Sequence, residues 1–508
     1  MRDLIIAGAG PVGLTAAIVA KQNGLDVVVL ERDLTTVTQS RAIWIHPRTL
    51  EIWNSVGLAE LALAEGRIVK GIQVSTSGSA RAILPYDGSG LSEFPYGLML
   101  EQSKTQEILA KFAERIGIPI RWGDSLVAIS QSKEGVTVTT ETTNGKSEII
   151  EGKYLLGADG GSSTVRKQLE IKLDGGTYNS SFFVADVEAD TDLNPDLAHL
   201  NFHSVKTVAV LPLPGEGRFR LIGNMPKESS GHQEPGYGRS LDLMEVRDLV
   251  SGSKLPMSVK EIGWTTTYRS HHRVANSFIS GRVALAGDAA HLHSPAGGLG
   301  MNTGVADAHN FVHKLLDATD MTAPFLLNLY NSERRGVAQS VIDTSDKLFT
   351  LQADTRKRFG FVRNHILPNV IGFISKQSWG KSLAFKVLSG TTVAYTRRSG
   401  TSLSRLGTLR FGSRFSSLQI PVIQKSELNK HLLLISPSAS SALSSQAEQV
   451  AATHHLLLKK LEQTTHKTHR LPRSDWLVWV RRDGHIEWMG SDFRKLSVAL
   501  EKHRNQIN

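Results

Sequence analysis

The sequence of 508 residues contains no cysteine. This absence excludes a disulfide framework, a thiolate metal site, a cysteine nucleophile and a CxxC redox pair, so any redox chemistry must come from a bound cofactor. No run of 18 apolar residues occurs, which excludes an ordinary membrane-spanning helix. The chain opens on "MRDLIIAGAG", which leaves no room for a signal peptide and predicts a cytoplasmic protein.

Aromatic residues are also scarce, at 6% of the chain, although the formal net charge is +10. The stretch "RRSGTSLSRLGTLRFGSR" carries five arginines with almost no aromatic residue between them. Proteins that bind nucleic acids combine basic grooves with aromatic side chains on which bases stack. We therefore expect a solvated basic surface here and no nucleic-acid partner.

The N-terminus carries a nucleotide-binding pattern. Residues 4–7 read as a buried strand, which is followed by Gly8, Gly10 and Gly13, a helical pattern, and a second strand that ends at Glu31. In such a GxGxxG turn the first glycine permits the tight turn, the second lets the backbone approach a pyrophosphate, and the third lets helix and strand pack closely. The helix N-terminus attracts phosphate, and the acid can accept a hydrogen bond from a ribose hydroxyl.

Two more strands end at an aspartate. Asp159 follows the strand in "YLLGADGG", and Asp288 follows the strand in "RVALAGDAAH". Because the carboxyl ends of parallel strands meet at one edge of a sheet, these carboxylates should lie near the glycine turn. A ligand that reaches the glycine turn and both of these carboxylates must be long.

The segment 287–310 admits two interpretations. Its histidines and aspartates, including His291 and His293, could form a catalytic site. Alternatively, Gly297, Gly298 and Gly300 form a loop against which a planar ring can lie, because β-carbons are missing there. We favour the glycine loop, since no further ligands can be assembled around the histidines; no metal site is expected.

The three motifs, in this order and spacing, resemble those of the group A FAD-dependent aromatic monooxygenases, the flavoproteins of the phenol hydroxylase and polyketide hydroxylase type. The resemblance covers at least residues 1–350. It implies that the first motif binds the ADP part of FAD, that "GADG" lies between FAD and transient NADPH or NADH, and that "GDAAH" holds the ribityl chain. It also implies that NAD(P)H reduces FAD and that a flavin C4a-hydroperoxide transfers one oxygen atom from O2 to a phenolic or polyketide-like small molecule.

Motif positions and the resemblance together give a set of expected FAD-binding residues, in which Arg41 and Gln102 rest on the resemblance alone. No acid or base for the reaction can be assigned from the sequence. The expected FAD-binding residues are Gly8, Gly10, Gly13, Glu31, Arg41, Gln102, Asp159, Asp288, Pro295, Gly298, Gly300, Met301 and Asn302.

The predicted fold class is α/β, with a Rossmann-like FAD-binding fold, an antiparallel β-sheet substrate domain and a C-terminal thioredoxin-like α/β domain. The period-two alternation in "SFFVADVEAD" predicts the sheet. The helical and C-terminal parts could cover the core or support a homodimer. The predicted boundaries are 1–176 and 271–350 for the FAD-binding domain, 177–270 for the sheet, 351–414 for a helical connector and 415–508 for the thioredoxin-like domain, which lacks cysteines.

Two alternatives stay open. One is another flavoenzyme of the same fold, such as an epoxidase or a drug-modifying hydroxylase. The other is a binding module without cofactor, against which the intact glycines and acids argue. Ser294 and Leu299 stand where the family more often has proline and glutamine, so the position of attack on the substrate stays open.

Overall fold

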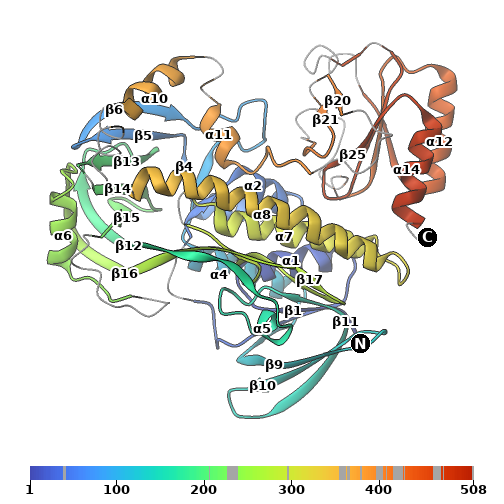
Figure 1. The fold of residues 1–508 in the computed structure, drawn as a ribbon, viewed down its shortest axis with the longest axis horizontal. Coiled ribbons are helices and arrows are strands. Elements are labelled where there is room, and N and C mark those ends of the chain that lie inside the picture. The colour runs from blue at the N-terminus through green and yellow to red at the C-terminus, as the bar shows by residue number, and fades with distance from the viewer. Residues whose placement is uncertain are drawn as a thin grey trace.

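The structure is a computed structural model with three parts in Figure 1: a central parallel sheet with its helices, a second sheet to the left, and a C-terminal part to the right. None of the described helices is long and apolar enough to cross a membrane. The described residues are 1–37, 42–204, 206–225, 238–294, 297–353, 362, 366–377, 380, 382–395, 404–407, 409–415, 427, 429–461, 471–472 and 474–505.

The central sheet has the strand order β17-β18-β11-β1-β2-β8, with β9 and β10 continuing from β11 as an antiparallel extension. The pairs β1–β2, β1–β11, β11–β18 and β2–β8 are parallel. The strand cores are almost wholly apolar because helices and loops bury both of their faces. The strands are β1 (Arg2–Ala7), β2 (Val27–Glu31), β8 (Ile120–Trp122), β9 (Asp124–Gln131), β10 (Val136–Thr142), β11 (Ser147–Gly157), β17 (Ile279–Ser280) and β18 (Val283–Leu285).

Helices α1, α4, α7 and α8 pack on this sheet and on one another, and α1 meets α7 at close range. A Cβ on Gly304 of α7 would lie 2.6 Å from the side chain of Val12 in α1, so only glycine permits this approach. The helices are α1 (Pro11–Gln22), α2 (Pro47–Asn54), α3 (Ala59–Glu65), α4 (Gln102–Arg115), α5 (Thr164–Gln168), α7 (Leu299–Leu316) and α8 (Ala323–Ala353).

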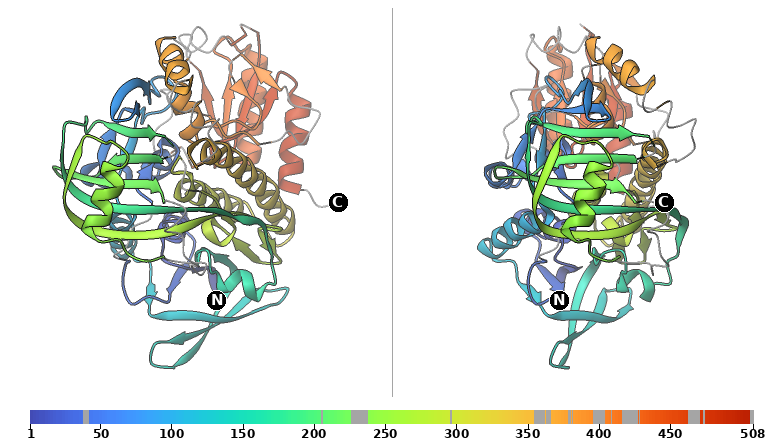
Figure 2. Two further views of the ribbon diagram at one scale, coloured as in Figure 1. Left: turned by 60° about the vertical axis from the view of Figure 1, so that its left-hand side comes forward. Right: turned by 90° about the vertical axis from the view of Figure 1, so that its left-hand side faces the viewer.

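The second sheet has the order β19-β16-β12-β15-β14-β13-β5-β6. It is antiparallel except for the parallel pair β13–β5. Figure 2 shows α6 (Leu243–Ser251) lying across one face, where Phe183, Val210 and Leu221 pack against it. The strands are β5 (Gly71–Thr76), β6 (Ser79–Pro85), β12 (Leu173–Thr191), β13 (Leu197–His203), β14 (Lys206–Pro212), β15 (Arg218–Asn224), β16 (Met257–Ala275) and β19 (His291–Leu292).

The boundaries of this sheet differ from those that the sequence predicts. The predicted limits at residues 177 and 270 fall inside β12 and β16, which pair with each other along most of their length. Strands β5 and β6 join the sheet from within the segment 1–176. A small sheet of β3 (Trp44–Ile45), β7 (Gly97–Met99) and β4 (Arg67–Val69) connects this region to the central sheet.

The C-terminal part contains a four-stranded sheet of order β23-β22-β24-β25. The pair β22–β23 is parallel, and β22–β24 and β24–β25 are antiparallel. The prediction of a mixed α/β fold is confirmed. The elements are α10 (Leu367–Lys376), α11 (Leu383–Leu388), β20 (Arg405–Leu406), β21 (Leu409–Arg410), β22 (Leu432–Ile435), α12 (Ser441–His454), β23 (Leu457–Lys460), β24 (Leu477–Val480), β25 (Ile486–Gly490) and α14 (Phe493–Asn505).

A buried group of charged side chains joins this C-terminal sheet to α7 and α8. Glu333 of α8 accepts hydrogen bonds from Lys314 at 2.6 Å and from Arg481 at 2.7 Å. Arg481 also donates to Asp483 at 2.7 Å, and Asn310 donates to both carboxylates. Burial alone would raise the pKa of Glu333, but Arg481 and Lys314 outweigh it and hold that pKa below its ordinary value. Each charge therefore lies beside a buried charge of opposite sign.

Glu333→Gln should lower the free energy of unfolding by about 3–5 kcal/mol, because it leaves two buried cations with too little negative charge. The measurement is chemical denaturation of the full chain, with the exposed Glu448→Gln as the matched control. A loss below about 1 kcal/mol, as for a surface ion pair, would contradict a stabilising role for this group.

Candidate functional site

The glycine turn after β1 is held in place by its own backbone. Gly8 has φ +104°, and a Cβ there would lie 2.4 Å from the carbonyl oxygen of Ala158. A Cβ on Gly13 would lie 2.0 Å from the carbonyl oxygen of Gly8. A Cβ on Gly10, in contrast, would meet no atom within 4 Å. The first and third glycines are thus required by the protein itself, whereas the second faces open space.

Glu31 lies at the end of β2, directly beside this turn. Its carboxylate accepts hydrogen bonds from the backbone N–H of Ala9 at 2.7 Å and of Asp33 at 3.1 Å. Gln106 of α4 donates to the Ala9 carbonyl at 2.8 Å and accepts from Val37. The turn is therefore fixed from both sides before any ligand binds.

Asp159 follows β11 at the same edge, but its oxygens are used within the chain. They accept from the hydroxyl of Ser163 at 2.5 Å and from the backbone N–H of Val165 at 3.0 Å, at the start of α5. The buried Arg166 then donates to the carbonyls of Gly161 and Ala289. This links the loop of Asp159 to the turn that follows β18.

Asp288 stands in the 3-10 turn Gly287–Ala289 and is exposed. No hydrogen bond or ion pair joins its carboxylate to another side chain of the described ranges. The turn itself is held from behind by the fully buried Asp307 of α7, which accepts from the N–H of Gly287 at 3.1 Å and from His291 at 2.7 Å. Asp288 is the acid that the fold leaves available to a ligand.

Asp307 also accepts from Arg334 of α8 at 2.7 Å, and both side chains are buried. Burial alone would raise the pKa of Asp307, but Arg334 and His291 outweigh it and hold the pKa below its usual range. The carboxylate is therefore ionised and can keep all three donors.

The glycine loop leads into α7. Gly298 is the N-cap of this helix with φ +63°, and a Cβ there would lie 3.0 Å from Trp44. Asn302 accepts from the N–H of His46 at 2.8 Å and from Thr49, and donates to the carbonyls of Trp44 and Gly298. Its amide therefore braces the loop and has all its bonds within the protein. Any contact of Asn302 with a ligand would have to come from its backbone.

His46 supports the same loop from β3. Its Nε2 lies 2.8 Å from the carbonyl oxygen of Gly297, and its Nδ1 lies 3.0 Å from the hydroxyl of Tyr86. Because a carbonyl only accepts, Nε2 donates and Nδ1 accepts from Tyr86, which is a neutral imidazole. Burial lowers the pKa of His46 to about 4, although the bond to Gly297 opposes this.

The remaining predicted residues have varied surroundings. Gly300 faces the imidazole of His293, at 3.2 Å from a Cβ, and Met301 is half-buried against the core. Gln102 begins α4 and accepts from the backbone N–H of Ala42 at 3.0 Å. Arg41 and Pro295 lie outside the described residues.

FAD fits this arrangement. The N-terminus of α1 has no side-chain cap and no acid in its first turn, so it favours the negative charge of a pyrophosphate. Gly10 offers the space for close approach, and the exposed Asp288 can accept bonds from sugar-alcohol hydroxyls. Glu31, Asp159 and Asp288 follow β2, β11 and β18 of one sheet, as a long dinucleotide requires.

One face of the second sheet points away from α6. Phe182 and Tyr268 are paired across β12 and β16 on this face, and the Tyr268 hydroxyl is buried without a hydrogen-bond partner among the described residues. Arg220 is wholly buried and binds Asp186 through two bonds of 2.6 and 2.7 Å. Asp186 therefore compensates the charge of Arg220 inside the sheet.

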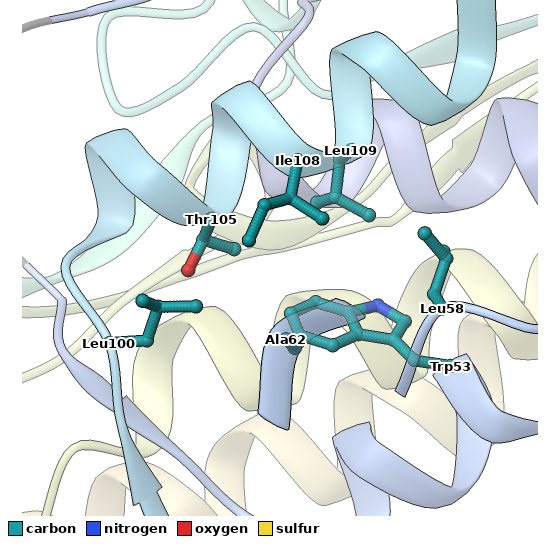
Figure 3. A pocket seen from close by; sticks show the side chains of 7 residues that line it. All are labelled: Trp53, Leu58, Ala62, Leu100, Thr105, Ile108 and Leu109. Atoms are coloured by element: carbon teal, nitrogen blue, oxygen red, sulfur yellow. The ribbon is translucent and has the colours of Figure 1, made fainter. Parts of the chain in front are cut away.

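The pocket in Figure 3 lies elsewhere, between α2, α3 and α4, and is lined by Trp53, Leu58, Ala62, Leu100, Thr105, Ile108 and Leu109. It has no room for a water molecule, so it cannot hold an aromatic substrate.

Sequence reasoning missed the residues that hold the site from behind: His46, Gln106, Arg166, Asp307 and Arg334. Asp307 gave no local signal, because its neighbours at helical spacing include the polar residues Thr303, Asn310 and Lys314. The other four have partners far away in the chain, which no local pattern reveals.

Comparison with known proteins agrees with this geometry. The family model described as an FAD binding domain matches residues 1–345. The 6-methylpretetramide 4-monooxygenase of Streptomyces rimosus is 36% identical over 376 residues, which cover 72% of this chain and 63% of that protein. An uncharacterized aromatic compound monooxygenase, YhjG of Bacillus subtilis, is 28% identical over 96% of this chain and 94% of its own length. The solved structure of the anhydrotetracycline hydroxylase OxyS from Streptomyces rimosus aligns with a TM-score of 0.76 and 26% identity over 98% of each chain.

The neutral His46 makes stability depend on pH. The pKa of His46 is about 4 in the folded protein against 6.5 in the unfolded chain. Between these two pH values His46 is protonated in the unfolded chain and neutral in the folded protein. Stability is therefore lost on acidification, by about 2 kcal/mol between pH 7 and pH 5. His46→Gln should remove this share of the pH dependence, as measured by chemical denaturation at both pH values. If the wild type and His46→Gln lose the same stability between the two pH values, the role of His46 is contradicted. His455→Gln, at an exposed histidine, is the control and should keep the wild-type pH dependence.

Proposed function

Because the chain belongs to the family of this FAD binding domain, the group A flavoprotein aromatic monooxygenases, we propose that it inserts one oxygen atom from O2 into an aromatic small molecule. The observation that carries the proposal is the single edge of the central sheet at which the open Gly10, Glu31 and the exposed Asp288 meet. A cofactor-free binding module would have no need to keep that edge open and charged.

When bound, FAD would supply the redox chemistry, with NADPH or NADH as the electron donor and water taking the second oxygen atom. The chain's own residues bind and orient the cofactor. The N-terminus of α1 and the backbone at Gly10 would hold the pyrophosphate, and Glu31 would accept from a ribose hydroxyl. Asp288 would bind the ribityl hydroxyls. The loop at Gly297 and Gly298, fixed by His46 and Asn302, would support the ring.

The substrate would lie between this loop and the second sheet. Leu299, which follows the loop, packs in one cluster with Trp44, Leu211 and Phe385, so apolar side chains from the loop, the sheet and α11 meet there. Apolar walls with few polar groups suit a flat aromatic ligand. Relatives named for tetracycline intermediates and for pentachlorophenol support a phenolic or polyketide-like substrate.

The proposed domain division keeps residues 1–176 and 271–350 as a Rossmann-like FAD-binding domain and 177–270 as the main part of the substrate domain. The order β22-α12-β23-β24-β25-α14 supports a thioredoxin-like domain at 415–508. A homodimer and a cytoplasmic location stay predictions.

The first experiment is an absorbance spectrum of the purified protein, followed by NADPH and NADH consumption in air with phenols, hydroxybenzoates and polycyclic quinones. A flavin spectrum, with oxidation stimulated by one class of compound that gains a single oxygen atom, is the expected result. A colourless protein that FAD cannot reconstitute would overturn the proposal and favour a binding module. A flavoprotein that forms an epoxide would favour the alternative flavoenzyme.

Asp288→Ala should weaken FAD binding by about 10- to 100-fold, because one charge-assisted set of hydrogen bonds is lost. The measurement is flavin retained after dialysis and the FAD dissociation constant by fluorescence. Asp320→Ala, at a carboxylate that is 95% exposed between α7 and α8, is the control. Full retention of the yellow colour in Asp288→Ala would contradict the role of Asp288.

A further inference from the structure

Three side chains from distant parts of the chain meet where the C-terminal end of α7 touches the C-terminal sheet. They are Asp317, directly after α7, His431, directly before β22, and His503 on α14. One ligand atom of each lies within 4.8 Å of those of the other two. All three side chains are largely buried, with exposed fractions of 16%, 12% and 15%.

The geometry centres on one oxygen of Asp317. Its Oδ2 accepts a hydrogen bond from Nε2 of His431 at 2.9 Å and lies 3.6 Å from Nε2 of His503. The Nε2 of His503 is buried and has no hydrogen-bond partner among the described residues. The other oxygen, Oδ1, lies 2.9 Å from Nε of Arg482, which fixes the carboxylate and leaves Oδ2 facing the two imidazoles.

Two imidazole nitrogens and one carboxylate oxygen are the donor set of many zinc sites. Zinc bonds of about 2.0–2.1 Å in a tetrahedron place neighbouring ligand atoms about 3.3 Å apart. The separations of 2.9 and 3.6 Å lie on either side of that value. We propose that Asp317, His431 and His503 form a site for Zn²⁺, with water as the fourth ligand, that fastens the C-terminal part of the chain to α7.

One carboxylate and one nearby arginine set the fixed charge at the site, because Arg482 lies beside Oδ1 of Asp317. Metal binding through Nε2 of His431 places the ring proton on Nδ1. It therefore replaces two contacts: the hydrogen bond of 2.9 Å from Nε2 of His431 to Asp317, and the long contact of 3.4 Å in which Trp479 donates to Nδ1. These exchanges and the nearby Arg482 predict a site of moderate affinity.

The site goes beyond the flavin chemistry and does not depend on it. The sequence led us to expect no metal, because no further ligands could be assembled around the histidines of the segment 287–310. The fold brings the residue after α7, the residue before β22 and a residue of α14 together at one place.

The test uses the full chain, treated with a chelator, dialysed and titrated with ZnCl₂ at pH 7.5 by calorimetry, with the thermal unfolding midpoint as a second readout. We expect one equivalent of zinc to bind and to raise the unfolding midpoint. His503→Ala and Asp317→Asn should each raise the dissociation constant by at least about tenfold and abolish the stabilisation. His455→Ala, an exposed histidine of the same domain, should change neither.

If the wild-type chain does not bind one equivalent of zinc in the calorimetric titration, that result alone overturns the proposal. Binding that survives in the double variant Asp317→Asn/His503→Ala would also overturn it, since the metal would then sit on other histidines. Circular dichroism and retained flavin absorbance show that each variant is folded. None of these outcomes bears on the proposed monooxygenase activity, so the zinc site and the activity are tested independently.

Discussion

The carboxylate of Asp307 is the interaction on which the rest of the site depends. It is fully buried, yet it stays ionised because Arg334 of α8 and His291 donate to it. Its third donor is the N–H of Gly287, which opens the turn that carries Asp288. One buried charge therefore fixes the turn, the start of β19 and two helices to one another. A neutral side chain could not hold three donors and compensate a buried arginine.

The hydrogen bonds within the chain determine which polar groups remain available to a ligand. Asp159 and Asn302 have the residue types expected of ligand-binding groups, but hydrogen bonds within the chain use their side chains. Asp288 and the space at Gly10 are not used in this way. In this site most polar side chains are fixed by hydrogen bonds within the chain, and only a few groups are left for a ligand. Because the loop is already ordered, ligand binding costs less conformational entropy.

The local part of this arrangement was predictable. The first strand, the glycine turn, the helix and Glu31 follow one another within a short stretch, so their spacing carries the geometry. The assignment of β5 and β6 to the second sheet was not predictable, since a parallel partner such as β13 lies more than a hundred residues away. The burial of Arg220 was not predictable for a similar reason. An alternating strand pattern shows which residues share a face, but it does not show that Asp186 on the neighbouring strand compensates a buried cation.

The connection between the flavin-binding region and the C-terminal sheet follows from the same physics. Arg334 extends from Asp307 to the hydroxyl of Tyr395, which also accepts from Asn310, and Asn310 reaches Asp483 beyond it. A charged chain of this kind is stable only when every member is present, because each group is buried and relies on its neighbour. The C-terminal sheet therefore completes the hydrogen bonding of α7 and α8, the helices that carry Asp307 and Arg334. The chain has no cysteine, so this sheet carries out no disulfide chemistry, and the contacts that join it to α7 and α8 include those of Asp483 and Arg481 with Asn310 and Glu333.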